Sequence, residues 1–509
     1  MLPRAYDVAV IGGGHNGLAC AALLAKSGLS VAVFERSERL GGAAVSEPVW
    51  PGYTVSTASY VCTLLDPWIE RELDLARHGY SAYRKDPATF NVRHDGRSLL
   101  LGSDGAANAA EIAAFDARDV AGFELLDRRL RSLGSRLFDS FSDPEPSFSQ
   151  FDARTQETLR GSAADLVEPC VNTPILQAAI ATDGIIGTFA GPRDPGTAYV
   201  LAHHYAGRAL GVQGAWGYVR GGMGAISNAL AAAARTHGAV LQCSSEVDGI
   251  SIEDGRACGV VLRDGNEIRA RFVASNAHPY TTFISLAGEK HFEAQFVARV
   301  RDWKTTGVAF KLNLALGELP DFRSRPGKTA QPHHRATIHV APSIDYLQDA
   351  FEDARAGSIS KQPMLECFLQ TTTDGALAPP GKHVLSIFAQ YYPYNRDDGW
   401  GGAQREAVAD RIIYALAQFA PNLPGAIEAR QILSPVDLEQ RFGLVGGHIF
   451  HGELLPGQIY EDRFATRTPL QNLYLCGSGA HPGGCVSGIP GKRAAQAILT
   501  DARQLRAAT

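Results

Sequence analysis

The chain has 509 residues, of which 45% are hydrophobic and 20% charged, with a net charge of −5. This length predicts two or three domains with ample core, and the composition is that of a globular protein. The acidic net charge and the lack of a basic run argue against a nucleic-acid partner. The eight cysteines form no CxxC pair and no zinc spacing, so we expect free thiols and no metal site.

Membrane and export signals are also missing from the sequence. No apolar stretch approaches the roughly 20 residues of a transmembrane helix. The first apolar run begins at Tyr6, which leaves no room for a signal peptide. We therefore expect a cytoplasmic protein without a transmembrane segment, with peripheral membrane contact still open and the oligomeric state not indicated.

The first forty residues predict a dinucleotide-binding unit. An apolar run at 6–11 precedes a glycine turn, a helical pattern and a second apolar run that ends in Glu35, as in a Rossmann βαβ unit. Gly12 permits the turn, Gly14 lets a pyrophosphate approach the backbone, and Gly17 lets the helix pack closely on the strand. Glu35 is placed to accept hydrogen bonds from both ribose hydroxyls. Further candidate contacts are His15 and Asn16, within the turn, and Arg36, after the acid.

A glycine pair, Gly41 and Gly42, follows the acid. It resembles the doublet of FAD enzymes in the glutathione-reductase and amine-oxidase superfamily, where the flavin half of the cofactor passes under the chain. The resemblance implies FAD rather than NAD. Residues 43–48 contain no cysteine, so disulphide-reductase chemistry lacks its nucleophile. No second complete glycine fingerprint occurs, and we expect no separate NAD(P) domain.

The middle of the chain alternates between helical and strand patterns. Residues 105–180 are mostly helical in pattern, whereas 184–217 are rich in Gly, His and aromatic residues and match no regular element. A helix opens near Gly224, and three short strands follow, separated by Asp-Gly turns. In flavoproteins of this superfamily the chain leaves the dinucleotide-binding domain and comes back to it with such a strand. The resemblance implies that its backbone near Val247 would meet the adenine.

The closing stretch combines a buried-strand pattern at 472–476, a long glycine loop from Gly477 through Gly488, and a helix at 492–499. Such a loop can run beside a flat ring system. The helix N-terminus can face the negative charge of a reduced flavin. Gly477 and Gly488 are therefore candidate flavin contacts.

Three motifs in the right order, GGGHNGL…FERSERLGG, GAWGYVRGGMGAISNAL and TPLQNLYLCGSGAHPGGCVSGIPGKRAA, resemble the phytoene-desaturase-like FAD oxidoreductases over nearly the whole chain. The nearest branch is the one named for pyridine nucleotide-disulphide oxidoreductase domain-containing protein 2. Two positions depart from the patterns of such flavoproteins. Ser478 stands where glutathione-reductase-type proteins have an acid, and Cys485 stands where a third glycine is expected.

The resemblance implies an α/β fold of the glutathione-reductase/amine-oxidase type. A discontinuous Rossmann-type FAD-binding domain would comprise residues 1–100, 218–290 and 462–509. A mixed α+β substrate or cap domain would comprise 101–217 and 291–461.

Candidates for chemistry are weaker than those for cofactor binding. His448 and His481 are possible catalytic groups, although a structural role competes for each. Trp216 and His203 are candidate substrate contacts, with core packing as the alternative. Covalent attachment of the flavin to Cys485 is a further possibility, less favoured because it depends on geometry.

We expect an FAD-dependent oxidoreductase that takes a hydride from an apolar organic substrate and is reoxidised by oxygen or a quinone. A desaturase or dehydrogenase reaction follows from the resemblance, while amine-oxidase-like C–N oxidation fits the wider superfamily. The alternative from another class is an FAD-stabilised interaction protein without turnover.

Overall fold

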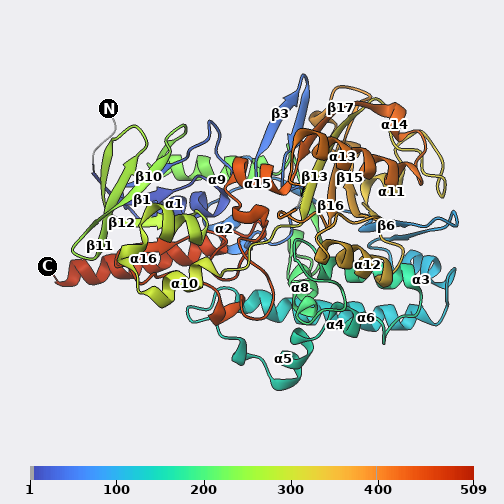
Figure 1. Ribbon diagram of the computed structural model, residues 1–509, viewed down its shortest axis with the longest axis horizontal. Helices are drawn as coiled ribbons and strands as arrows, with labels where there is room; N and C mark the ends of the chain where they lie inside the picture. The colour runs from blue at the N-terminus through green and yellow to red at the C-terminus, as the bar shows by residue number, and fades with distance from the viewer. Residues whose placement is uncertain (1–4, 397, 509) are drawn as a thin grey trace.

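The computed structural model describes residues 5–396 and 398–508, and two large β-sheets lie side by side in it (Figure 1). The first sheet has the strand order β10-β11-β12-β1-β2-β9, with β18 also paired to β12. Strands β9, β2, β1, β12 and β18 run parallel, whereas β10, β11 and β12 form antiparallel hairpins. The bounds are β1 Ala5–Ile11, β2 Val31–Phe34, β9 Val240–Gln242, β10 Val247–Glu253, β11 Arg256–Leu262, β12 Glu267–Ser275 and β18 Leu473–Leu475.

Three helices, α1 (His15–Lys26), α9 (Gly224–Thr236) and α16 (Ile489–Ala508), share one hydrophobic core with this sheet. Small residues allow α1 and α16 to pack closely. A Cβ on Gly491 would lie 2.1 Å from the carbonyl oxygen of Asn16, so only glycine fits at this crossing. The packing fixes the N-terminus of α1 against the closing segment of the chain.

The second sheet has the order β17-β13-β16-β15-β14-β6-β7 and is antiparallel except for the parallel pair β14 and β6. All eight residues of β13 are buried. Phe310, Leu312 and Leu314 pack in a core with α13, while Ala309 and Lys311 line a pocket on the other face. The bounds are β6 Thr89–Val92, β7 Ser98–Leu101, β13 Ala309–Leu316, β14 Thr337–Val340, β15 Met364–Phe368, β16 His383–Gln390 and β17 Ile427–Leu433.

In Figure 1, α14 lies near the upper end of the second sheet, α13 overlaps its strands, and α3, α4, α5, α6 and α8 lie below it. The helix bounds in this half are α3 Gly105–Ala113, α4 Asp119–Ser140, α5 Ala153–Arg160, α6 Ala163–Val167, α7 Pro174–Ala181, α8 Thr197–His204, α11 Pro332–Arg335, α12 Ile344–Arg355, α13 Gly402–Ala417 and α14 Leu423–Ala426. The remaining elements are α2 Pro67–Glu72, α10 Ala294–Arg301, α15 Pro435–Phe442, β3 Ser46–Trp50, β4 Tyr53–Ser56, β5 Ala82–Arg84 and β8 Gly217–Val219.

The structure differs from the sequence-based expectations at three places. Strand β6 and all of β7 but Leu101 lie within residues 1–100, yet both strands pair in the second sheet. Helix α10 lies beyond residue 290, yet its Val300 and Phe296 belong to a core of the first sheet. Helix α8 forms where the sequence predicted no regular element. All eight of its residues are buried, so the amphipathic pattern that would have indicated a helix is missing.

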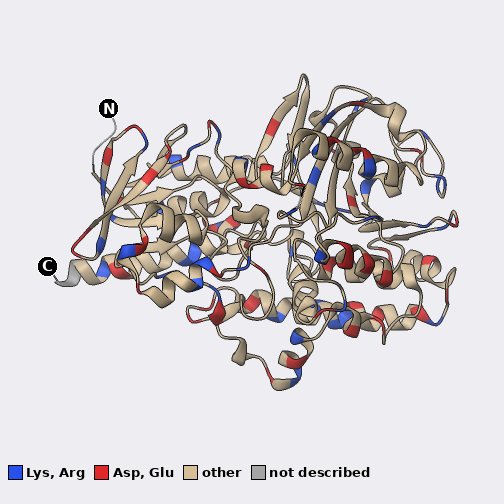
Figure 2. Ribbon diagram, viewed as in Figure 1, with Lys and Arg blue, Asp and Glu red and all other residues tan. Residues whose placement is uncertain are grey.

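Figure 2 shows basic and acidic residues interspersed along both halves of the ribbon. Among the residues that the structure describes, no helix combines the length and the apolar character needed to cross a bilayer.

Candidate functional site

A cavity of about 750 Å³ extends from the glycine turn after β1 to the second sheet. Gly14, Glu35 and Val247 line its part along the first sheet, and Trp216, Lys311 and Phe388 line its part along the second. Its volume lies within the range of cofactor and ligand pockets. A single pocket between two sheets can therefore hold a dinucleotide and a substrate together.

The glycine turn leaves no room for larger side chains. A Cβ on Gly14 would lie 2.7 Å from Nδ2 of Asn276, and one on Gly17 would lie 2.3 Å from the carbonyl oxygen of Gly12. Gly12 itself has φ +90°, which favours glycine. Gly12 and Gly14 line the pocket, whereas Gly17 only packs α1 against the turn.

Glu35 is held in a fixed position at the pocket wall. Its Oε2 accepts a hydrogen bond from the Gly13 N–H (2.7 Å) and its Oε1 accepts one from the Ser37 N–H (2.9 Å). Each carboxylate oxygen keeps a second lone pair, which a ribose hydroxyl can use. Arg36 and Val247 line the same part of the pocket, and the Arg36 guanidinium donates to the Gln440 carbonyl oxygen (3.0 Å).

The glycine doublet touches the first turn. The N–H of Gly41 donates to the Gly13 carbonyl oxygen (2.8 Å), and a Cβ on Gly42 would lie 3.2 Å from Cα of Gly14. Gly42 lines the pocket and Gly41 does not. The doublet therefore packs against the glycine turn at the edge of the pocket.

The two glycines of the closing loop that were candidate flavin contacts do not reach the pocket. Gly477 and Gly488 are both outside the pocket lining. A Cβ on Gly477 would lie 2.6 Å from the Asn276 carbonyl oxygen, and one on Gly488 would lie 2.7 Å from Cδ1 of Ile69. These glycines allow close packing of the loop, while Ser478 and Cys485 from the same loop line the pocket.

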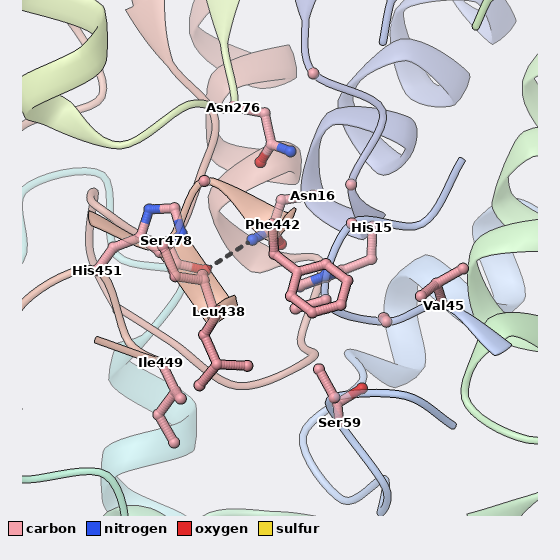
Figure 3. Close-up of a pocket in the computed structure, with 18 of the residues that line it drawn as sticks. His15, Asn16, Val45, Ser59, Asn276, Leu438, Phe442, Ile449, His451 and Ser478 are labelled. Carbon is pink, nitrogen blue, oxygen red and sulfur yellow. Dashed lines mark hydrogen bonds between the residues drawn. The ribbon is translucent and has the colours of Figure 1, made fainter. Parts of the chain in front are cut away.

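Several buried polar atoms face the pocket without a partner. Nε2 of His15, Oδ1 of Asn16 and Nδ1 of His451 have no hydrogen bond within the described part of the chain, although buried polar atoms are normally paired. Figure 3 shows His15 and His451 on opposite sides of the pocket, with the Asn16–Ser478 hydrogen bond (3.2 Å) between them. Burial lowers the pKa of His15 to about 4 and that of His451 to about 3, so both rings are neutral at pH 7. These groups and the glycine cradle fit an FAD molecule.

The histidines proposed for catalysis lie outside the pocket lining. Nδ1 of His448 accepts from the Phe450 N–H (3.2 Å), and its Nε2 lies 3.3 Å from Oε1 of Glu453. His481 is buried against the rings of Phe141 and Tyr460. The structure places both as internal residues, and His451 is the histidine of the GGHIFHGE segment that reaches the pocket.

Of the two proposed substrate contacts, Trp216 lines the pocket and His203 does not. The neighbouring His204 takes that position and stacks on Trp216, with ring centroids 5.7 Å apart. His203 instead packs against Phe141 and Tyr199. The predicted segment therefore reaches the pocket through Trp216 and His204, and His203 lies in the core behind them.

Cys485 lines the pocket and has φ +74°. This left-handed conformation explains why a glycine is expected at its position. Burial raises the pKa of the Cys485 thiol to about 12. The thiol is therefore protonated at pH 7, which disfavours covalent attachment to a flavin.

Sequence reasoning missed a polar cluster on the second-sheet side of the pocket. Lys311 is 2% exposed and lines the cavity beside Tyr60. The Tyr60 hydroxyl donates to Oε2 of Glu366 (3.2 Å), whose Oε1 pairs with Nε2 of His339 (2.9 Å). The only sequence signal was a lysine inside the run at 308–316, which is apolar apart from Lys311 and Asn313. In residues 5–396 and 398–508, no three His, Cys, Asp or Glu side chains lie close enough together to hold a metal ion.

The model of the flavin-containing amine oxidoreductase family matches residues 17–499. Pyridine nucleotide-disulphide oxidoreductase domain-containing protein 2 of Mus musculus is 39% identical, over 98% of this chain and 94% of that protein. Phytoene desaturase (lycopene-forming) of Pseudescherichia vulneris is 26% identical, over 96% of this chain and 98% of its own length. An engineered triple mutant of putrescine oxidase has the same fold, with a TM-score of 0.64 at 15% identity over 98% and 99% of the two chains.

These matches cover nearly the whole chain and agree with the pocket geometry. The Rossmann-type α/β fold and the FAD cofactor predicted from the sequence are confirmed. The protein belongs to the flavin-containing amine oxidoreductase family and is an FAD-dependent oxidoreductase similar to pyridine nucleotide-disulphide oxidoreductase domain-containing protein 2.

Proposed function

We propose that the protein oxidises an apolar organic substrate held between the flavin and the second sheet, in a desaturase or dehydrogenase reaction. When bound, FAD supplies the electron acceptor and takes a hydride from a substrate carbon. The electrons then leave to oxygen or a quinone, because the sequence has a single complete glycine fingerprint.

The observation that carries this proposal is the wall of the pocket beyond the cofactor turn. Its side chains are largely aliphatic and aromatic and come from the cap segments: Ile186, Trp216, Phe388, Ile449 and Phe450. Such a wall excludes water from the reacting carbon and positions an apolar molecule. The similarity to a phytoene desaturase, at 26% identity, also supports an apolar substrate.

C–N oxidation is less well supported. A protonated amine at this wall would meet Lys311, whose buried side chain is an ammonium below about pH 7, and like charges in a buried site repel. A protein without turnover is also disfavoured, since burying a lysine in a ligand pocket lowers stability without a structural gain.

Anaerobic mixing of the purified holoprotein with polyenes, amines and alcohols tests the proposal. We expect one or more uncharged apolar compounds to bleach the flavin, and the colour to return when air or a quinone is admitted. Bleaching by amines alone would favour C–N oxidation. A flavin that no compound bleaches would contradict the proposal.

A further inference from the structure

Tyr60 presents a hydrogen-bond acceptor to the pocket. Its side chain follows β4, is half-buried and packs on the ring of Phe368, with centroids 4.3 Å apart. Its hydroxyl proton is directed to Oε2 of Glu366 at 3.2 Å. A phenol whose proton is already donated has only lone pairs left for a further partner, so Tyr60 Oη acts toward the pocket as an acceptor.

Lys311 presents hydrogen-bond donors beside it. Its ammonium donates to Oγ of Ser386, which in turn donates to Oδ1 of Asn313 (3.0 Å). Its Nζ lies 4.4 Å from the ring centroid of Tyr60. An ammonium has three N–H donors, and among the described residues no carboxylate lies within 4.0 Å of Nζ. The lysine is therefore held in place with donor capacity left for a ligand.

We propose that the substrate is an apolar molecule bearing a hydroxyl group, which the protein oxidises to a carbonyl; this inference rests on the proposed function. A hydroxyl is both a donor and an acceptor, so it can donate to Tyr60 Oη while accepting from Lys311 Nζ. A carboxylate would face the lone pairs of Tyr60, and an ammonium would face Lys311. The pair therefore matches an alcohol better than an acid or an amine.

The residues behind Tyr60 provide a route for the alcohol proton. The substrate O–H bond breaks toward Tyr60 Oη as the Tyr60 proton moves to Oε2 of Glu366. The adjacent C–H bond breaks as the C=O double bond forms, and FAD, when bound, would supply the acceptor for the hydride. Each turnover thus releases one hydride and one proton from the alcohol.

The electrostatics of Glu366 suit a proton acceptor. Burial alone would raise the pKa of its carboxyl, but the hydrogen bond from His339 and nearby positive charges bring it below the usual value. Glu366 is therefore ionised at pH 7. Its other oxygen lies 2.9 Å from Nε2 of His339, whose Nδ1 lies 2.8 Å from Oγ1 of the half-buried Thr89. This chain of hydrogen bonds leads from the pocket toward the outer strands of the second sheet.

The first test compares compounds with one carbon skeleton. Holoprotein is mixed anaerobically with 2-octanol, 2-aminooctane and 2-octene, and with cyclohexanol, cyclohexylamine and cyclohexene. We expect the alcohol of at least one set to bleach the flavin roughly tenfold faster than its partners, as a matched polar contact should provide. Faster bleaching by the amine or the alkene overturns the hydroxyl proposal and leaves oxidoreductase function intact.

The second test removes the acceptor and the proton route. Tyr60→Phe and Glu366→Gln should each slow bleaching by the alcohol about 100-fold, the usual contribution of a positioned proton acceptor, with unchanged FAD content. Glu366→Gln should also abolish the solvent isotope effect on that step. The matched control is Tyr346→Phe, which loses a half-buried hydroxyl that donates to the Pro363 carbonyl oxygen (2.9 Å) outside the pocket and should leave the bleaching rate unchanged. Wild-type rates in both pocket variants overturn the proposal.

A binding measurement separates this inference from the proposed function. Calorimetry with the unreactive tertiary alcohol 2-methyl-2-octanol should show affinity that falls about tenfold in Tyr60→Phe, the loss of roughly one hydrogen bond. Tyr60-dependent binding without bleaching by any secondary alcohol would support hydroxyl recognition but contradict oxidation. Equal affinity for 2-methyloctane and the alcohol overturns the inference.

Discussion

The two sides of the pocket are encoded in different ways. On the first-sheet side, many of the lining residues come from one continuous stretch, 12–42, in which the glycines are required by close approaches of the backbone. On the second-sheet side, Tyr60, Lys311 and Glu366 come from distant parts of the chain and meet only after the sheet forms. The comparison indicates that cofactor binding depends on backbone shape, whereas substrate handling depends on a few side chains.

The largest effect is expected from Gly14→Val, which targets the backbone shape of the first side. The new Cβ would lie 2.7 Å from Nδ2 of Asn276 and would block the approach of the pyrophosphate. We expect colourless protein with FAD content near zero, measured from the absorbance of flavin released on denaturation. Gly105→Val is the control, because a Cβ there meets nothing within 4 Å. Full flavin content in Gly14→Val would refute the assignment of the turn.

Arg463→Met tests the connection between the two sides. The buried guanidinium donates to the carbonyl oxygens of Ser478, Phe450 and Glu453 at 2.6–3.2 Å. Its removal leaves several buried carbonyls unpaired, and each costs about 1–3 kcal/mol. We expect the free energy of unfolding to fall by about 3 kcal/mol or more in urea titrations. The control Arg467→Met breaks an exposed ion pair with Asp501 and should lower the free energy of unfolding by less than about 1 kcal/mol. Similar losses of stability in both variants would contradict the structural role of Arg463.

Lys311→Met tests the chemistry of the second side. We expect full FAD content and flavin bleaching by the substrate slowed about tenfold or more, through loss of a charged hydrogen-bond donor. Burial lowers the pKa of Lys311 to about 7, so wild-type bleaching should fall as the pH rises through that value. Lys311→Met should lack this fall in bleaching rate with rising pH. A fall of the same size in the variant would show that another group titrates.

The same lysine gives a stability signature of defined sign. Because its pKa is lower in the folded protein than in the unfolded chain, the unfolded state binds more protons above pH 7, and stability should rise with pH in that range. Thermal unfolding of Lys311→Met should show a smaller rise than wild type between pH 7 and pH 9.

Trp216→Ala should have the smallest effect of the four. Its ring stacks on His204 in the pocket wall and lies outside the cofactor turn. We expect normal folding and FAD content, with a several-fold change in KM or in the choice between small and large substrates. Loss of flavin or of folding would show that the tryptophan is a core residue and that the pocket wall lies elsewhere.

The first-sheet side of the pocket could be predicted from the sequence better than the second-sheet side. That Gly14, Glu35 and Gly42 line the pocket could be predicted, because the glycine turn, the acid after the second strand and the glycine doublet lie close together in sequence. The position of Lys311 could not be predicted, since a lone lysine in a strand does not reveal which face it occupies. His203 and His204 show the same limit, because the turn of α8 decides which ring reaches the pocket. The place of β6 and β7 could not be predicted, because they join a sheet whose other strands begin only at Ala309.

FAD content and the anaerobic bleaching rate, measured on the same preparations of Gly14→Val and Lys311→Met, test the division of the pocket most directly. We predict that Gly14→Val loses its flavin, while Lys311→Met keeps a full complement of FAD that the substrate bleaches slowly. Loss of flavin from Lys311→Met, or bleaching of its flavin at the wild-type rate, would contradict the account.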